Sequence, residues 1–136
     1  MMGLIVPASK SGISEHFAAR LNGLPHSPEA VAYAIGVLGK RKWRDGDDLS
    51  DVSLCIVFQD ALLKRDFVGF QRIGDWVLFA EIVVPDHIKT YREVAENLAR
   101  LSYYECFRLM GQQWRVYEEL ADELPKFTAS ARQRLA

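Results

Sequence analysis

The chain is poor in the features that mark secreted, membrane-spanning and nucleic-acid-binding proteins. Its two cysteines, Cys55 and Cys106, lie in separate apolar stretches and do not form a CxxC pair. No apolar run reaches the ~18 residues of a membrane-spanning helix, and residues 1–10 lack the basic start and apolar stretch of a signal peptide. A formal net charge of −1 gives no whole-chain attraction to nucleic acid or anionic lipid. These absences predict a cytoplasmic protein that does not enter a membrane.

Residues arranged for catalysis or metal binding are also scarce. His16, His26 and His87 are far apart, and none has a histidine, cysteine or glutamate at the spacing of a ligand pair. Four aspartates occur close together, at Asp45, Asp47, Asp48 and Asp51. A calcium loop counted from the first of them would need glycine and glutamate where Ser50 and Ile56 stand. The sequence therefore predicts no metal and no cofactor, and it favours a non-enzymatic protein.

What the chain does contain is apolar residues at helical spacing, enough for one domain of 136 residues. Ser27 followed by Pro28 is typical of a helix start, and Pro125 is expected to end the last helix. We expect an all-α bundle of about five helices with a long C-terminal helix. The expected ranges are 11–21, 28–44, 50–65, 67–84 and 86–124, with residues 1–10 and 128–136 as flexible ends.

Residues 67–84 allow two interpretations. Gly74-Asp75 could form a two-residue turn between two strands, which would make the protein α+β. Alternatively, the segment is a helix that is apolar nearly all round and lies at the centre of the bundle. We favour the helix, because a lone two-stranded hairpin among helices is only marginally stable.

The order of short motifs in the C-terminal half is Gly74-Asp75, Leu78-Phe79, Pro85-Asp86, Tyr103-Tyr104 and Leu120-Ala121. This order resembles that of a group of uncharacterised bacterial all-helical proteins, whose motifs read L-G-D-x-x-L-F, Tyr-Tyr and L-A-x-x-F. The chain departs from that pattern at Phe107, where the group usually has glycine. The resemblance implies a helical fold, with residues 67–84 as a helix, and it implies no particular activity.

An aromatic stripe runs along the expected C-terminal helix. Its residues follow at alternating steps of four and three, and those with candidate binding roles are Tyr103, Phe107, Met110, Trp114 and Tyr117. Such a stripe is typical of a helix that packs on another helix, and its residue types are enriched at interfaces. Our main hypothesis is that the protein binds another protein, or itself, through this stripe. A second core layer is the equally weighted alternative.

A basic cluster offers a second hypothesis. Its members are Lys40, Arg41, Lys42, Trp43 and Arg44, which together could contact phosphates and stack on a base. Basic residues at a helix C-terminus also complement the helix dipole, and the near-neutral chain lacks the charge of most nucleic-acid-binding domains. A solvated helix end is therefore favoured over a nucleic-acid site, and nucleic acid is not an expected partner.

Arg72 and Asp75 form the third candidate site. A charged pair three residues apart on an apolar helix requires other polar groups to complete it. We expect a buried polar network that joins Arg72 and Asp75 to the hydroxyls of Tyr103 or Tyr104. The same residues could line a small-ligand or enzymatic site, but a structural role is favoured.

Overall fold

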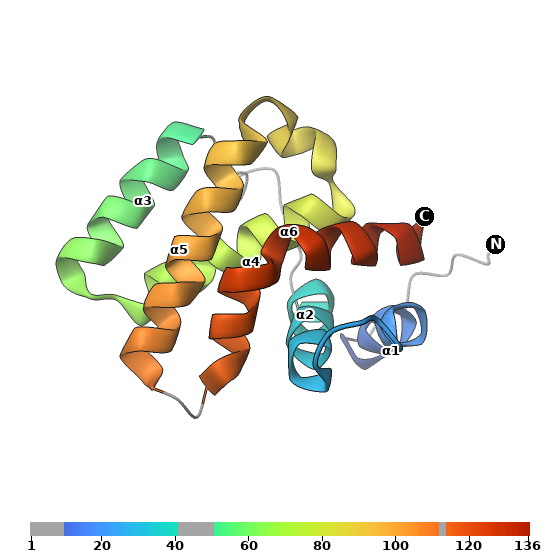
Figure 1. Ribbon diagram of the computed structural model, residues 1–136. Helices are drawn as coiled ribbons and strands as arrows, with labels where there is room; N and C mark the ends of the chain where they lie inside the picture. The colour runs from blue at the N-terminus through green and yellow to red at the C-terminus, as the bar shows by residue number, and fades with distance from the viewer. Residues whose placement is uncertain (1–9, 41–50, 112–113) are drawn as a thin grey trace.

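Helices make up most of the described chain (Figure 1). The computed structural model describes residues 10–40, 51–111 and 114–136. The α-helices are α1 (Lys10–Leu21), α2 (Pro28–Lys40), α3 (Asp51–Lys64), α4 (Phe67–Val83), α5 (Arg92–Met110) and α6 (Arg115–Leu135), and a 3-10 helix, η2 (Pro85–Tyr91), joins α4 to α5. No strand occurs within these ranges. The predicted all-α fold is therefore confirmed, and the alternative hairpin at 67–84 is wrong.

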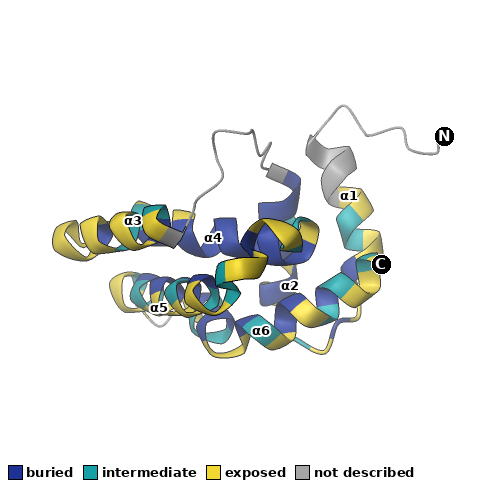
Figure 2. Cartoon of the chain, turned by 90° about the horizontal axis from the view of Figure 1, so that it is seen from above, coloured by how far each residue is buried: buried dark blue, intermediate teal, exposed yellow. Residues whose placement is uncertain are grey.

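The helix α4 is the centre of the bundle and packs against α2, α3, α5 and α6. Asp66 caps it, accepting a hydrogen bond from the Val68 N–H at 3.1 Å. Buried residues lie on every side of α4, and they include Phe70, Ile73, Trp76 and Leu78. Figure 2 shows α4 buried along most of its length, whereas α3 and α5 have exposed outer sides. Burial on all sides explains why this segment is apolar without a strand-like alternation.

The expected long C-terminal helix is confirmed as α6, but the range 86–124 expected for it contains most of η2, all of α5 and the first part of α6. Met110 ends α5, and Gly111 follows with a positive φ of 84°, a conformation that favours glycine. The chain then turns back, so that α5 and α6 pack against each other (Figure 1). The predicted single helix over 86–124 is wrong because apolar residues at this spacing also fit two helices that face each other across a turn.

Pro125 lies inside α6 and does not end it. The helix continues to Leu135, although Figure 1 shows that it changes direction near its middle. Phe127, Thr128 and Ala131 are buried beyond the proline, so their packing stabilises the helical continuation. Residues 128–135, expected as part of a flexible end, therefore belong to α6. The other expected flexible end, 1–10, lies almost entirely outside the described residues.

The end of α6 also holds α1 in place. Arg134 donates hydrogen bonds from its guanidinium to the carbonyl oxygens of Asn22, at 2.8 Å, and Gly23, at 3.2 Å. These carbonyls lie just beyond Leu21, the last residue of α1. A cation at this position complements the negative end of the α1 dipole.

Candidate functional site

The predicted start of α2 is confirmed, and it is joined to α6. The Ala30 N–H donates to the Ser27 hydroxyl oxygen at 3.1 Å, which is an N-cap bond. Glu119 of α6 accepts the Ser27 N–H at 3.0 Å on one carboxylate oxygen and the Ser27 hydroxyl on the other. A side chain of α6 therefore binds the residue that starts α2.

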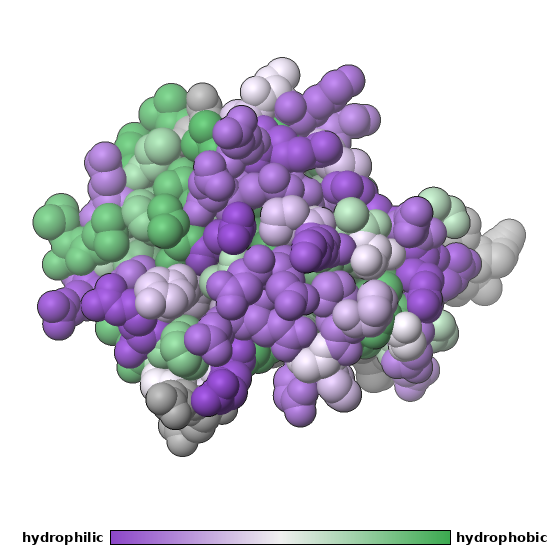
Figure 3. Space-filling view, in the orientation of Figure 1, coloured by the Kyte–Doolittle hydropathy of each residue, from purple (hydrophilic) through white to green (hydrophobic). Residues whose placement is uncertain are grey.

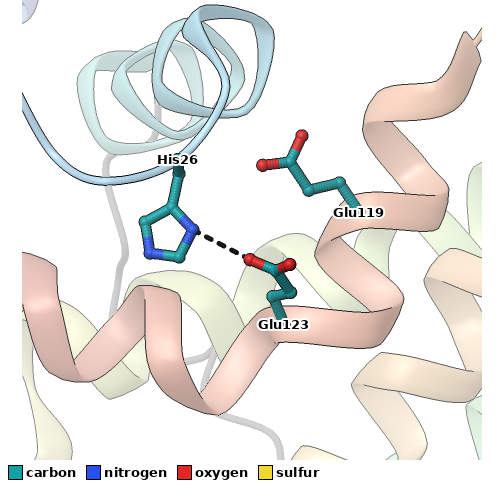
Figure 4. A group of neighbouring side chains, drawn as sticks. All are labelled: His26, Glu119 and Glu123. Atoms are coloured by element: carbon teal, nitrogen blue, oxygen red, sulfur yellow. Dashed lines mark hydrogen bonds and ion pairs between the residues drawn. The ribbon is translucent and has the colours of Figure 1, made fainter.

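His26, which precedes Ser27, and Glu123, one turn further along α6, extend this contact (Figure 4). The His26 Nδ1 atom lies 3.2 Å from a Glu123 carboxylate oxygen, and only 5% of the His26 side chain is exposed. Its ring packs on the buried Phe127, with 4.9 Å between the ring centroids. One nitrogen of His26 and one oxygen each from Glu119 and Glu123 lie within 4.8 Å of one another.

Sequence reasoning missed this cluster. Ligand spacing along the chain can identify only near neighbours, whereas His26 and Glu123 are 97 positions apart. The available signal was the pair Glu119 and Glu123, which are four residues apart and therefore share one face of a helix. His16 and His87 are exposed, as expected for surface residues.

A cavity of about 850 Å³ lies between α2 and α6 beside this cluster. Its lining includes Tyr33 from α2, Trp114 at the start of α6, and Glu119. Ala32 and Val116 add apolar surface. The cavity is therefore mainly apolar, with a carboxylate on the side that faces the His26 cluster.

The polar network expected around Asp75 exists in part. Asp75 is 8% exposed and accepts hydrogen bonds from the hydroxyls of Tyr103, at 2.9 Å, and Tyr33, at 2.6 Å. Arg72 and Tyr104 are exposed, so these two expected members lie outside the buried network. Tyr33 takes their place, and its position on α2 gave no sequence signal that linked it to Asp75.

Burial also sets the chemistry of this network. Burial first, and then the Asp75 carboxylate, raises the pKa of Tyr103 and that of Tyr33 well above the usual range of a tyrosine. Both hydroxyls therefore stay protonated and act as hydrogen-bond donors. This arrangement suits a structural role better than proton transfer.

The aromatic stripe is divided between two helices. Tyr103 and Tyr117 are buried and stack at 6.0 Å between ring centroids. Phe107 and Met110 are partly buried on α5. Trp114, which is 42% exposed, stacks on Tyr117 at 6.4 Å. A partner can therefore reach Trp114, but not Tyr103 or Tyr117 while the fold is intact.

The basic cluster cannot be placed. Residues 41–44 lie outside the described residues, as do the aspartates at 45, 47 and 48, and Lys40 is the last residue of α2. Both cysteines are free: Cys55 is exposed on α3, and Cys106 is buried. Burial raises the pKa of the Cys106 thiol to about 12, so it is not a reactive thiolate.

Glu81 is a buried carboxyl group that the sequence did not single out. It is 1% exposed, and its carboxylate lies 3.2 Å from Arg132 and 3.6 Å from Arg92. Burial and the neighbouring Glu96 outweigh these two arginines and raise the pKa of Glu81 from 4.5 to about 7. The Thr128 hydroxyl donates to the same carboxyl group at 3.3 Å.

We expect Glu81 to make stability fall as the pH rises from about 4.5 to about 7. In this interval the folded protein keeps the Glu81 proton that the unfolded chain has lost, so rising pH favours unfolding. In Glu81→Gln this contribution disappears, and Tm should fall less with pH than in the wild type. Melting curves across this interval measure the difference, with Glu93→Gln, an exposed glutamate of α5, as the control. Parallel pH profiles for wild type and Glu81→Gln would contradict the expectation.

No protein-family model matches the chain, and comparison with curated proteins and with solved structures gives no match. Among the helices of the described ranges, none combines the length and the apolar character that crossing a membrane requires.

Proposed function

We propose that the protein acts without catalysis, by associating with a second copy of itself through the outer face of α3. The observation that carries this proposal is the exposure of large apolar side chains on that face. Leu63 is 86% exposed, Val52 62% and Ile56 60%. Single exposed apolar residues are common, but a contiguous group on one helix face is typical of an interaction surface.

These residues lie on one side of α3. The opposite side carries Leu54 and Ala61, which are buried and face the bundle. At 100° per residue, the outer arc contains Val52, Cys55, Ile56, Gln59, Leu62 and Leu63. All of them are exposed, and Figure 3 shows hydrophobic surface gathered over the α3 side of the molecule. We call this set the α3 outer face.

The spacing of the α3 outer face favours a second copy as the partner. Along the sequence, Val52 and Leu63 are equally far from the midpoint of the α3 outer face, and so are Ile56 and Gln59. Two antiparallel α3 helices related by a two-fold axis would therefore place Val52 against Leu63 of the second copy. A surface that complements itself in this way is what a two-fold dimer requires.

The charges at the ends of α3 are complementary in the same arrangement. The helix begins at Asp51 and ends at Lys64. Antiparallel pairing brings the N-terminus of one α3, the positive end of its dipole, level with the C-terminus of the other, the negative end. Lys64 already lies 3.2 Å from Asp60 on its own helix, so the ends of the interface would carry both signs of charge.

Self-association is the mode of action expected from the sequence, but we place it on the α3 outer face instead of the aromatic stripe. Tyr103 and Tyr117 of the aromatic stripe are in the core, so the stripe cannot form an interface as a whole. The proposal places the protein in the cytoplasm, where the exposed thiol of Cys55 would stay reduced.

Leu63→Glu is expected to weaken self-association at least about 100-fold, because each chain would bury a charge without a partner at the interface. The measurement is mass by light scattering on a sizing column over a concentration series. Wild type should be a dimer that dissociates on dilution, and Leu63→Glu should be a monomer. Since Leu63 is exposed, the variant should keep its circular dichroism spectrum.

The matched control is Leu101→Glu, which introduces the same charge at an exposed leucine of α5. It should remain a dimer. A wild type that is monomeric at every concentration, or a Leu63→Glu variant that is as dimeric as wild type, would overturn the proposal. A wild-type dimer disrupted by Leu101→Glu alone would assign the interface to α5.

A further inference from the structure

We propose that His26, Glu119 and Glu123 bind a divalent transition-metal ion of the Zn²⁺ type. The three side chains converge from two segments far apart in the chain, the start of α2 and the face of α6 (Figure 4). This inference does not depend on self-association through α3.

The chemistry of the three groups suits such an ion. An imidazole nitrogen and carboxylate oxygens are common Zn²⁺ ligands, and three protein ligands plus water are typical of an open zinc site. The two carboxylates together carry a charge that a divalent cation neutralises. Mg²⁺ prefers oxygen ligands in near-octahedral geometry and suits a site with an imidazole less well.

The three ligand atoms would have to move only a short distance toward one another to bind one ion. The three ligand atoms lie within 4.8 Å of one another, and His26 Nδ1 is 3.2 Å from Glu123. Ligand atoms about 2.1 Å from a tetrahedral ion lie about 3.4 Å apart. The Glu123 side chain is about half exposed, so rotation of its carboxylate can bring the ligands toward this separation.

Contacts within the folded chain already fix the positions of two of the ligands, His26 and Glu119. The His26 ring is packed on Phe127 and is almost fully buried, which fixes the direction of its nitrogens. Glu119 is held by its hydrogen bonds from Ser27. Such supporting contacts reduce the ordering that metal binding would otherwise require. Glu119 also lines the cavity of about 850 Å³, which leaves room for water or a further ligand on the ion.

An ion at this position would join the segment between α1 and α2 to α6. Because it would bind the folded chain, in which the ligands converge, it should raise the melting temperature. We expect Tm to rise by about 8 °C when free Zn²⁺ is 100 times its dissociation constant. Mg²⁺ at the same concentration should give little or no rise.

The experiment is a melting series of the full chain with Zn²⁺ and with Mg²⁺, together with calorimetric titration of Zn²⁺. The test variants are Glu123→Gln and His26→Gln. Glu123→Gln keeps an oxygen that can accept a hydrogen bond from His26, so it should fold. The control is Asp122→Asn, which removes the same charge from an exposed position next to the site.

Wild type and Asp122→Asn should bind one Zn²⁺ per chain, and both test variants should lose at least about nine-tenths of the affinity. If Zn²⁺ neither binds nor shifts Tm in the wild type, the three residues form only a hydrogen-bond network and the proposal is wrong. If folded Glu123→Gln and His26→Gln both keep the full Tm rise, Zn²⁺ binds elsewhere and the proposal is equally wrong.

Discussion

Gly74→Ala is expected to destabilise the protein by about 3 kcal/mol. A Cβ atom on Gly74 would lie 2.6 Å from ring carbons of Tyr103, a separation that packed atoms do not adopt. Tyr103 is fully buried, and its hydroxyl is bound to Asp75, so its ring cannot move aside without breaking that bond. Urea denaturation followed by circular dichroism measures the loss.

Gly36→Ala is the matched control, because it makes the same change in a helix with open space around it. Apart from its two chain neighbours and the backbone of its own helix, no described heavy atom lies within 4 Å of the position of its Cβ. Alanine favours helix over glycine, so Gly36→Ala should stabilise the protein by about 0.5–1 kcal/mol. If the two variants have equal stability, α4 does not pack against Tyr103 as closely as the structure places it.

Asp75→Leu is expected to destabilise the protein by about 3 kcal/mol, because one buried and one partly buried hydroxyl lose the carboxylate that accepts their hydrogen bonds. The hydroxyls belong to Tyr33 and Tyr103, which bind the Asp75 carboxylate at 2.6 and 2.9 Å. Asp75→Asn keeps an acceptor oxygen and should cost about 1 kcal/mol. The same urea denaturation measures both variants.

A triple variant tests the cause of this loss. Removing all the polar partners together is far less costly than removing one of them. Adding Tyr33→Phe and Tyr103→Phe to Asp75→Leu should therefore restore at least half of the lost stability. A triple variant that is less stable than Asp75→Leu would show that the hydroxyls are satisfied elsewhere in the single variant.

The centre of the fold could be predicted from sequence because its residues have no polar side. Phe70, Ile73, Trp76 and Leu78 point in different directions around one helix, and a bundle of this size has room for one such helix. The start of α2 could be predicted as well, since Ser27 and Pro28 act locally.

The C-terminal half could not be predicted in the same way. The aromatic stripe from Tyr103 to Tyr117 keeps its helical spacing across Gly111, so the same pattern fits one long helix or two facing ones. Pro125 disfavours a helix interior by about 3 kcal/mol. Burial of Phe127 and Ala131 outweighs that penalty, and this packing appears only in three dimensions.

The candidate metal site could not be predicted from the sequence for a related reason. His26 and its two glutamates are brought together only when α6 packs beside the start of α2. Likewise, nothing in the sequence distinguished the outer side of α3 from its inner side, because both are apolar. The structure separates them by showing that Leu54 is buried and Leu63 is exposed.

The hydrogen bonds from Arg134 to the end of α1 affect the order in which the chain folds during synthesis. Both α1 and α2 leave the ribosome long before α6 exists, yet the residues that anchor α1 lie near the end of α6. The nascent α1–α2 pair therefore lacks the hydrogen bonds from Arg134 until α6 docks. We expect docking of α6 to be a late step in folding, governed by contacts between distant parts of the chain.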